Sequence, residues 1–445
     1  MSVQSSTALK WDAAPVPAFR EHPTKLFVET TSRCNLSCVM CMKQNPEWTA
    51  CDGDLDMQTF TSLEPAFPSL EALVLNGVGE PLLNTGLERF IAEAKKLMPS
   101  HGWTGFQTNG LLLTNMRAVS LLNAGLDRIC LSMDGVDAGT FGAIRAGSQL
   151  HDLEWALKAL DSAKRVCSRP DLKIGVEYVV MRDNLRQLPA ALAWAAERGA
   201  SFAIVSHLHP FDEPHLDRCA YDVCTDEALQ LFQTWKAKAH LLGVDINRYF
   251  GILWKYTKSF EEQRIVAFVE AIKADAQDRG IAFDLKRLFN MDYSRIEETS
   301  AVFEEAEAVA ARTGLELRLP EIVRRERKRC FFVEDGGAFV SWDGRMHPCY
   351  QLWHHCRSFA NGWLHPVHPR VFGSIREMDI LDIWNSKEFR TYRENVLRHD
   401  YPSCSCCNFA PCDLVQNDKF DLDCYANAEP CGGCLWSSGV FRCLD

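Results

Sequence analysis

The segment Lys25-Leu-Phe-Val-Glu-Thr30 leads into Cys34-Asn-Leu-Ser-Cys38-Val-Met-Cys41, and these two segments organise the chain. The first is an apolar run typical of a buried strand, and the second places three thiols within eight residues at the spacing C-x3-C-x2-C. A strand that ends in a short cysteine-rich loop suits a metal site at the mouth of an α/β barrel. Three thiolates are one fewer than a four-ligand iron–sulfur or zinc site needs. The stretch therefore indicates either a redox cluster with one open iron position or a zinc site completed from elsewhere.

Length and composition limit the classes of protein. The chain has 445 residues, enough for two or three domains, with 47% hydrophobic and 24% charged residues. A net charge of -11 argues against nucleic-acid binding as the main role. No run of about 18 uncharged apolar residues occurs, and residues 1–20 lack the pattern of a secretory signal, so we expect neither a membrane span nor export. In the reducing cytoplasm expected for this chain, 19 cysteines indicate metal or redox chemistry.

Between residues 25 and 210, strand-like apolar runs alternate with amphipathic helical segments. Six strands are expected, at 26–29, 72–76, 105–108, 128–132, 173–180 and 202–205. Helices are expected between them, at 87–97, 115–124, 153–166 and 188–198. Strands that alternate with helices predict a parallel sheet, and the length fits an open, partial (β/α)6 barrel better than a closed eight-unit one.

The remaining sequence divides into three parts. Residues 1–24, which contain three prolines, read as a loose leader before the 25–210 core. Residues 211–327 carry long charged helical patterns and are expected to form a helical insertion or lid, with a purely structural buttress as an equal alternative. Residues 328–445 are rich in Cys, Gly, Trp and Pro, which predicts a small domain held together by metal.

Motifs follow one another at the ends of successive predicted strands. After the cysteine loop come Gly77-Val-Gly-Glu-Pro81, Gln107-Thr-Asn-Gly110, Leu131-Ser-Met-Asp-Gly135 and then Arg145. Each alone is an ordinary turn signal. In this order they resemble the motifs of radical S-adenosylmethionine (SAM) enzymes, over roughly residues 25–210.

The resemblance implies a cofactor arrangement and a reaction. Cys34, Cys38 and Cys41 would hold a [4Fe–4S] cluster whose fourth iron is ligated by the amino and carboxylate groups of SAM. An external one-electron reductant of the flavodoxin or ferredoxin type would drive cleavage of SAM to a 5′-deoxyadenosyl radical, which abstracts hydrogen from a substrate. Met40 stands where an aromatic residue is common in this family. The residues implied to contact SAM are Met40, Gly77, Gly79, Glu80, Pro81, Asn109, Ser132, Asp134 and Arg145.

Eleven of the cysteines fall between Cys330 and Cys443. The run Cys330-x13-Gly344-x4-Cys349 resembles the opening of a SPASM domain, which carries auxiliary [4Fe–4S] clusters. Two such clusters need eight thiolates, one fewer than the nine candidates, and structural zinc is the alternative. The candidate ligands are Cys330, Cys349, Cys404, Cys407, Cys412, Cys424, Cys431, Cys434 and Cys443, with Cys356 and Cys406 as spares.

Local strings narrow the resemblance to one kind of SPASM enzyme. Cys431-Gly-Gly-Cys-Leu-Trp436 and Gly77–Asn84 are similar to maturases of tungsten-cofactor oxidoreductases of the aldehyde ferredoxin type. A maturase that modifies a peptide or protein is the alternative, and a multi-cluster electron-transfer protein is the alternative that is not an enzyme. Tyr350 takes the place of the catalytic Asp of sulfatase maturases. A phenol can donate or relay a hydrogen, so Tyr350 is the catalytic candidate, and a packed aromatic is its alternative.

Overall fold

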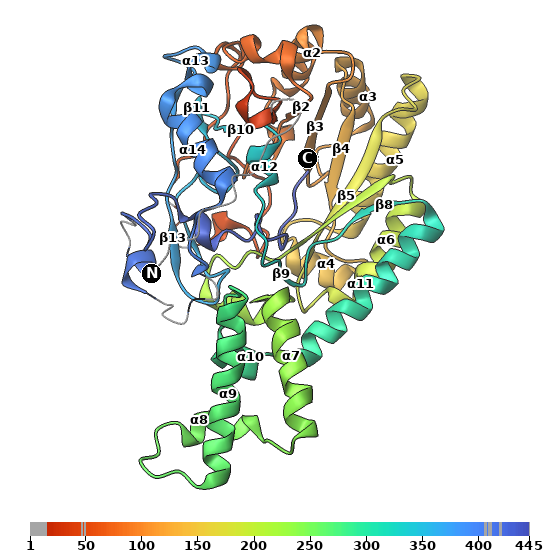
Figure 1. Ribbon diagram of the computed structural model, residues 1–445. Helices are drawn as coiled ribbons and strands as arrows, with labels where there is room; N and C mark the ends of the chain where they lie inside the picture. The colour runs from red at the N-terminus through yellow and green to blue at the C-terminus, as the bar shows by residue number, and fades with distance from the viewer. Residues whose placement is uncertain are drawn as a thin grey trace.

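A central sheet of parallel strands forms the body of the molecule (Figure 1). The computed structural model describes residues 16–45, 48, 50–404, 407, 412–417 and 421–444. Six strands pair in parallel in chain order, and most of their side chains are buried, as is typical of a sheet covered on both faces. They are β1 (Lys25–Val28), β2 (Ala72–Val74), β3 (Trp103–Thr108), β4 (Arg128–Ser132), β5 (Lys173–Val180) and β6 (Phe202–His207). The predicted α/β class with a parallel sheet is confirmed.

Amphipathic helices connect these strands and cover the sheet. α2 buries Leu87, Phe90, Ile91 and Ala94, whose spacing of three and four residues places them on one face of the helix. α3 begins where the Thr114 hydroxyl accepts a hydrogen bond from the backbone N–H of Arg117. The connecting helices are α2 (Leu87–Leu97), α3 (Asn115–Ala124), α4 (Ala138–Ile144), α5 (Leu150–Val166) and α6 (Leu188–Glu197).

The sheet is wider than the six predicted strands, because segments distant in the sequence extend both of its edges. β8 (Glu316–Arg318) pairs with β6, and β10 (Gly337–Val340) pairs in parallel with β1. β11 (Arg345–His347) and β14 (Gly373–Ser374) continue the β10 edge in antiparallel pairing. These strands have two to four residues each, too few to produce a recognisable apolar period.

Part of the predicted 211–327 insertion belongs to the core. α11 (Tyr293–Thr313) packs on α6, and Phe303, Ala306 and Val309 join the main hydrophobic core. We define the arm as residues 226–290, which form a separate helical unit with its own apolar core. The arm helices are α7 (Asp226–Leu241), α8 (Tyr249–Ile252), α9 (Phe260–Asp278) and α10 (Leu285–Asn290), and they project from one end of the sheet (Figure 1).

The C-terminal part lies against the β1 side of the sheet (Figure 1). Arg393 is buried there, donates to the backbone oxygen of Ala18 and lies 3.7 Å from the ring centre of Trp384. The described end of the predicted leader is therefore fixed to the fold, since Ala18 is fully buried. The helices are α12 (Phe331–Glu334), α13 (Ile380–Asn385), α14 (Lys387–Arg398) and α15 (Asp413–Gln416), and a hairpin joins β12 (Cys356–Ser358) to β13 (His365–Val367).

A few shorter elements complete the described chain. β7 (Asp222–Thr225) and β9 (Val323–Arg324) pair in parallel at the base of the arm, and α1 (Met57–Thr61) follows the cysteine loop. Two 3₁₀ helices border the sites below, η4 (Pro81–Leu83) and η9 (Pro430–Gly433). Across the described residues, every helix is too short or too polar to cross a membrane.

Candidate active site

A cavity of about 330 Å³ opens where the parallel strands end. The thiols of Cys34, Cys38 and Cys41 form part of its wall. Most of the residues that were predicted to contact SAM lie beside them. Those that line the cavity are Met40, Gly77, Gly79, Glu80, Asn109, Ser132 and Arg145.

The cysteine loop is held by backbone hydrogen bonds to the C-terminal end of α4 and the residues just after it. The N–H of Ser37 donates to the oxygen of Ala146 at 3.1 Å, and the N–H of Val39 donates to that of Ile144 at 3.0 Å. Within the loop, the N–H of Cys41 donates to the oxygen of Cys38. Burial raises the pKa of the Cys41 thiol to about 11. The loop thus presents closely spaced thiols that deprotonate readily only when a cation or cluster binds them.

Two glycines allow the loop after β2 to lie directly on the cysteine loop. A Cβ on Gly79 would lie 2.3 Å from the backbone oxygen of Thr31 and 2.4 Å from that of Arg33. A Cβ on Gly77 would lie 2.3 Å from Cγ of Glu29. The N–H of Glu80 then donates to the oxygen of Arg33 at 2.8 Å. A larger residue at Gly79 would push the two loops apart, since the atoms it meets are backbone.

Glu80 joins the loops that follow β2 and β3. Its carboxylate accepts hydrogen bonds from the hydroxyl of Thr108 at 2.6 Å, from the N–H of Asn109 at 2.8 Å and from the N–H of Leu82 at 3.1 Å. The side chain is buried, and burial raises its pKa while these hydrogen bonds lower it. The Asn109 amide also donates to Oδ1 of Asn35 in the cysteine loop at 2.8 Å. In this structure Glu80 positions the site, and its contact with SAM stays a prediction.

An ion pair supports the cavity from the side of β4. Nε of Arg145 lies 2.6 Å from Oδ2 of Asp134, and Oδ1 of Asp134 accepts from the N–H of Val179 at 2.7 Å. Nη1 of Arg145 lies 3.9 Å from Sγ of Cys38. Burial raises the pKa of the Asp134 carboxyl, and the Arg145 guanidinium opposes this rise. Asp134 therefore acts through Arg145, which places a positive charge beside a thiol of the loop.

Two predicted residues lie beside the cavity rather than in its wall. Pro81 is buried at the first position of η4, next to Glu80. Asp134 is buried behind Arg145. Neither residue lines the cavity, so the geometry supports them as positioning residues and leaves direct SAM contact as a prediction.

Among the polar side chains of the cavity wall that sequence reasoning missed are Asn76, Gln107 and Glu177. Asn76 and Gln107 are joined, since the Asn76 carbonyl oxygen accepts from the N–H of Gln107 at 2.6 Å, and the Gln107 amide donates to the carboxylate of Glu177. Burial raises the pKa of Glu177 to about 7, with Gln107 and the Arg145 charge opposing the rise. The signal that could have identified Glu177 was a charged residue inside the otherwise apolar run Ile174–Val180.

Four thiols of the C-terminal part form one buried group, which we call the inner thiol group. Burial raises the pKa of the Cys330 thiol, and the neighbouring Cys434 and Cys349 raise it further. Burial also raises the pKa of the Cys431 thiol, and the charges of Cys434, Cys349 and Cys330 raise it further. The four thiols therefore lie within electrostatic reach of one another. The members are Cys330, Cys349, Cys431 and Cys434.

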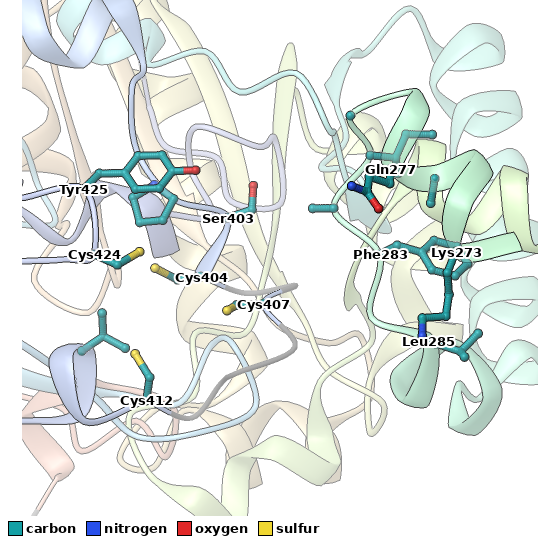
Figure 2. Close-up of a pocket in the computed structure, with 16 residues that line it drawn as sticks. Lys273, Gln277, Phe283, Leu285, Ser403, Cys404, Cys407, Cys412, Cys424 and Tyr425 are labelled. Atoms are coloured by element: carbon teal, nitrogen blue, oxygen red, sulfur yellow. The ribbon is translucent and has the colours of Figure 1, made fainter. Parts of the chain in front are cut away.

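A second set of four thiols, the outer thiol group, lies nearer the surface. Cys404, Cys407, Cys412 and Cys424 line one wall of a cavity of about 710 Å³. Figure 2 shows these thiols on one side of the cavity, with Gln277 and Phe283 of the arm on the opposite side. Burial raises the pKa of Cys404 to about 12, and Cys424 is exposed.

The two groups account for eight of the nine predicted auxiliary ligands. Cys443 instead shares a small cavity with Cys330, Tyr350 and Trp436. In the described part of the chain, no three His, Cys, Asp or Glu side chains converge closely enough to hold a single ion. The assignment of thiols to clusters therefore stays a prediction, and the spare Cys406 lies outside the described residues.

Tyr350 lies apart from the cavity that holds Cys34, Cys38 and Cys41. Its ring packs against those of Phe27, Phe332 and Trp436, at centroid distances of 5.8, 4.8 and 5.4 Å. It is not among the residues that line the 330 Å³ cavity. The packed-aromatic alternative describes this arrangement, and a catalytic role for Tyr350 gains no support from the geometry.

Similarity to known proteins agrees with this geometry. A family model described as the SPASM iron–sulfur cluster-binding domain matches residues 330–408. Over 427 residues the chain is 27% identical to the tungsten-containing aldehyde ferredoxin oxidoreductase cofactor-modifying protein of Pyrococcus furiosus, covering 94% of this chain and 96% of that protein. The chain is thus similar over nearly its whole length to a cofactor-modifying protein, and residues 330–408 match the SPASM domain.

Other similarities are partial. The PqqA peptide cyclase of Gluconobacter oxydans is 30% identical over 187 residues, which cover 42% of this enzyme and 49% of the cyclase, so the match spans about half of that protein. Among solved structures, Streptococcus suis SuiB bound to S-adenosylmethionine aligns with a TM-score of 0.48 at 11% identity, covering 84% of this chain and 68% of that one.

Radical SAM enzymes with a SPASM domain use SAM and [4Fe–4S] clusters, and the residues present in this chain fit these groups. Cys34, Cys38 and Cys41 line one open cavity, and as ligands of a [4Fe–4S] cluster they would leave one iron without a protein ligand. Arg145 supplies a buried positive charge beside thiolates that would otherwise repel one another. Thiols also recur through the C-terminal part, where residues 330–408 match the SPASM cluster-binding domain, and which of them would hold auxiliary clusters stays a prediction.

Proposed function

We propose that this enzyme matures a partner oxidoreductase of the tungsten, aldehyde ferredoxin type, by modifying that protein or its cofactor. The observation that carries the proposal is the match to the Pyrococcus furiosus cofactor-modifying protein, because it extends over nearly the whole of both chains. The match therefore includes the arm and the thiol-rich C-terminal part, which lie outside the shared radical SAM core.

The assignment of roles follows the geometry of the two regions. Cys34, Cys38 and Cys41 hold the cluster that binds SAM. The Gly77–Pro81 loop, Met40, Asn109, Ser132 and the Asp134–Arg145 pair surround the SAM site. The inner and outer thiol groups hold one auxiliary [4Fe–4S] cluster each, and Cys443 is left outside both. The boundaries that we propose are a core of 25–210 with the added α11 and β8, the arm, and an auxiliary domain from about residue 328.

When bound, the cluster and SAM supply the radical that removes a hydrogen atom from the substrate. The protein holds the site together through Glu80, which fixes two loops in place, and through Arg145, which keeps positive charge at Cys38. Glu177 holds or releases a proton near neutral pH at the wall of the same cavity. Its carboxylate is a suitable acceptor for a proton that leaves the substrate.

An external one-electron donor of the flavodoxin or ferredoxin type belongs to this proposal. The outer thiol group is the natural point of entry for its electron, because Cys424 is exposed. Solvent-accessible clusters and thiols suit a reducing compartment, so we place the enzyme in the cytoplasm.

The test uses the aldehyde ferredoxin-type oxidoreductase of the same organism, purified from cells that lack this enzyme. The oxidoreductase is incubated anaerobically with the reconstituted enzyme, SAM and a low-potential reductant, and its aldehyde oxidation is measured. We expect activity to rise at least about tenfold only when SAM and wild-type enzyme are both present. A triple variant with Cys34, Cys38 and Cys41 replaced by Ala is the matched control. No rise with wild-type enzyme would contradict the proposal.

Modification of a peptide is the second candidate. It is favoured by the 30% identity to PqqA peptide cyclase over 187 residues. The two candidates differ in the substrate that accelerates SAM cleavage, a short peptide in one case and the intact oxidoreductase in the other. Formation of 5′-deoxyadenosine in the presence of each substrate separates them.

A further inference from the structure

The far end of the arm carries a concentration of exposed apolar side chains. Trp254 is 89% exposed, Tyr256 is fully exposed, and Leu241 and Phe260 are 84% and 80% exposed. Leu242 and Phe250 are also exposed, so the six residues fall within twenty positions of the chain. Exposed apolar residues are usually scattered singly, and a cluster of this size marks an interaction surface. We define the tip as these six residues.

The tip is held in a fixed conformation although its side chains face solvent. The segment before α9 ends in a capping box, in which Ser259 and Glu262 exchange hydrogen bonds. Lys255 donates to Glu262 at 2.6 Å, and Arg248 donates to Glu261 at 2.8 Å. Tyr249 beneath the tip is buried and donates to Glu270 at 2.8 Å. A pre-ordered aromatic surface binds a partner with little further loss of conformational entropy.

The charge around the tip favours a protein over a membrane or a second copy. Residues 241–264 carry four basic and three acidic side chains, and two of the basic ones, Arg248 and Lys255, are paired with acids. Attraction to an anionic membrane needs several unpaired basic residues. Two copies of a chain with net charge -11 repel one another. Trp and Tyr are enriched among the residues that dominate protein–protein binding.

The base of the arm connects this surface to the active site. Phe211, in the segment that leads from β6 to the arm, lines the 330 Å³ cavity. The side of the arm formed by α9 and α10 faces the outer thiol group across the larger cavity (Figure 2). The arm projects from one end of the sheet (Figure 1), and both cavities include residues of the arm or of the segment that leads to it, so a folded protein seated on the arm lies near both sites.

We propose that the tip is the docking anchor for the partner oxidoreductase, and that it inserts Trp254 and Tyr256 into an apolar depression on that protein. This inference rests on the function proposed above and adds to it the surface that selects the partner. The tip alone is too small for a stable complex, which buries roughly 800 Å² on each partner, so contacts at the cavity mouth complete the interface.

The test measures binding of the reconstituted full-length enzyme to purified, tungsten-free aldehyde ferredoxin-type oxidoreductase by anaerobic biolayer interferometry. We expect the double variant Trp254→Ala/Tyr256→Ala to raise Kd at least about tenfold. Trp155→Ala is the matched control, because Trp155 is an exposed Trp on α5, outside the arm, and its Kd is expected to stay within about twofold of wild type. The single variant Trp254→Phe keeps an aromatic ring at this position, so it is expected to retain most of the wild-type affinity. Circular dichroism and partner-free SAM cleavage, both unchanged, verify that the variants are folded.

Each other outcome overturns the inference. If wild type and the double variant bind equally, the docking role fails while the proposed function stands. If wild type does not bind the oxidoreductase, the proposed function fails together with the inference. If wild type is a dimer in analytical ultracentrifugation and the double variant is not, the tip binds a second copy of the chain. If wild type sediments with 1:1 phosphatidylglycerol–phosphatidylcholine vesicles and the double variant does not, the tip binds a membrane.

Discussion

The core cavity and the thiol-rich C-terminal part bring cysteines together in two different ways. In the core, three thiols lie within eight residues, and the structure leaves an open cavity beside them. In the C-terminal part, each group gathers four thiols, and the inner group spans more than one hundred positions from Cys330 to Cys434. Under the proposed function, the incomplete set of three thiols would serve chemistry, and the sets of four would serve electron transfer or structure.

The largest expected contrast lies between the inner and outer thiol groups. Cys431→Ala removes a buried thiol, and we expect the loss of about four irons together with a fall in Tm of more than about 5 °C. Cys424→Ala removes an exposed thiol, so we expect a similar loss of iron and a Tm within about 2 °C of wild type. Iron analysis and anaerobic calorimetry measure both. An equally large fall in Tm for Cys424→Ala would show that the two groups are structurally equivalent.

The second largest effect is expected at the buried ion pair beside the core cavity, between Arg145 and Asp134. Arg145→Ala leaves the Asp134 carboxylate buried without its cation, which is expected to cost about 3–5 kcal/mol of unfolding free energy. It also removes the positive charge near Cys38, so SAM cleavage is expected to fall about 100-fold. Arg165→Ala breaks an exposed pair with Asp161 and is the control, with an expected cost below about 0.5 kcal/mol. Chemical denaturation and 5′-deoxyadenosine formation test both variants, and equal losses would contradict the assignment.

The close approach of two loops depends on a single glycine. Gly79→Ala is expected to cost about 1–3 kcal/mol and to weaken SAM binding about tenfold, because the added Cβ meets backbone oxygens of the cysteine loop. Gly251→Ala in α8 is the matched control, since its Cβ meets no atom within 4 Å. Isothermal titration with SAM measures the affinity. Unchanged SAM affinity in Gly79→Ala would show that the loop approach does not form the SAM site.

Core and C-terminal part also differed in what the sequence could predict. The strands of the core were predicted to within a few residues, because buried parallel strands are continuous apolar runs between helical periods. The short strands β8 and β10 were not predicted. They are stabilised by pairing with strands far along the chain and lack an apolar pattern long enough to be recognised. The charged pattern of α11 resembled that of the arm, and only its packing on α6 assigns it to the core.

The residues of the candidate site also differ in whether the sequence could identify them. Residues within motifs, such as Glu80 and Arg145, could be named from their spacing. Glu177 lies in no motif and reaches the cavity through the register of β5, and Asn76 reaches it from the loop after β2. Tyr350 was named from its place after Cys349, and its packing among aromatic rings is a tertiary fact that spacing cannot convey. The division of the C-terminal thiols into two groups likewise depends on loop paths.

The smallest expected effect concerns the proton on Glu177. Its pKa of about 7 lies above the usual value of 4.5, so the folded state binds the proton more tightly than the unfolded state. This contribution to stability is complete below about pH 4.5 and is lost as the pH rises through 7. Relative to Glu177→Gln, the wild-type Tm is therefore expected to fall by about 1–3 °C between pH 5 and pH 8. Parallel Tm curves for the two proteins would contradict the raised pKa.

The central claim is that the incomplete three-thiol site generates the radical. Reconstituted wild type and the triple variant with Cys34, Cys38 and Cys41 replaced by Ala are each given dithionite and SAM. Iron per chain and 5′-deoxyadenosine are then measured in the same samples. We expect about twelve irons and steady 5′-deoxyadenosine from wild type, against about eight irons and none from the variant. Full iron content or continued cleavage in the variant would contradict the claim.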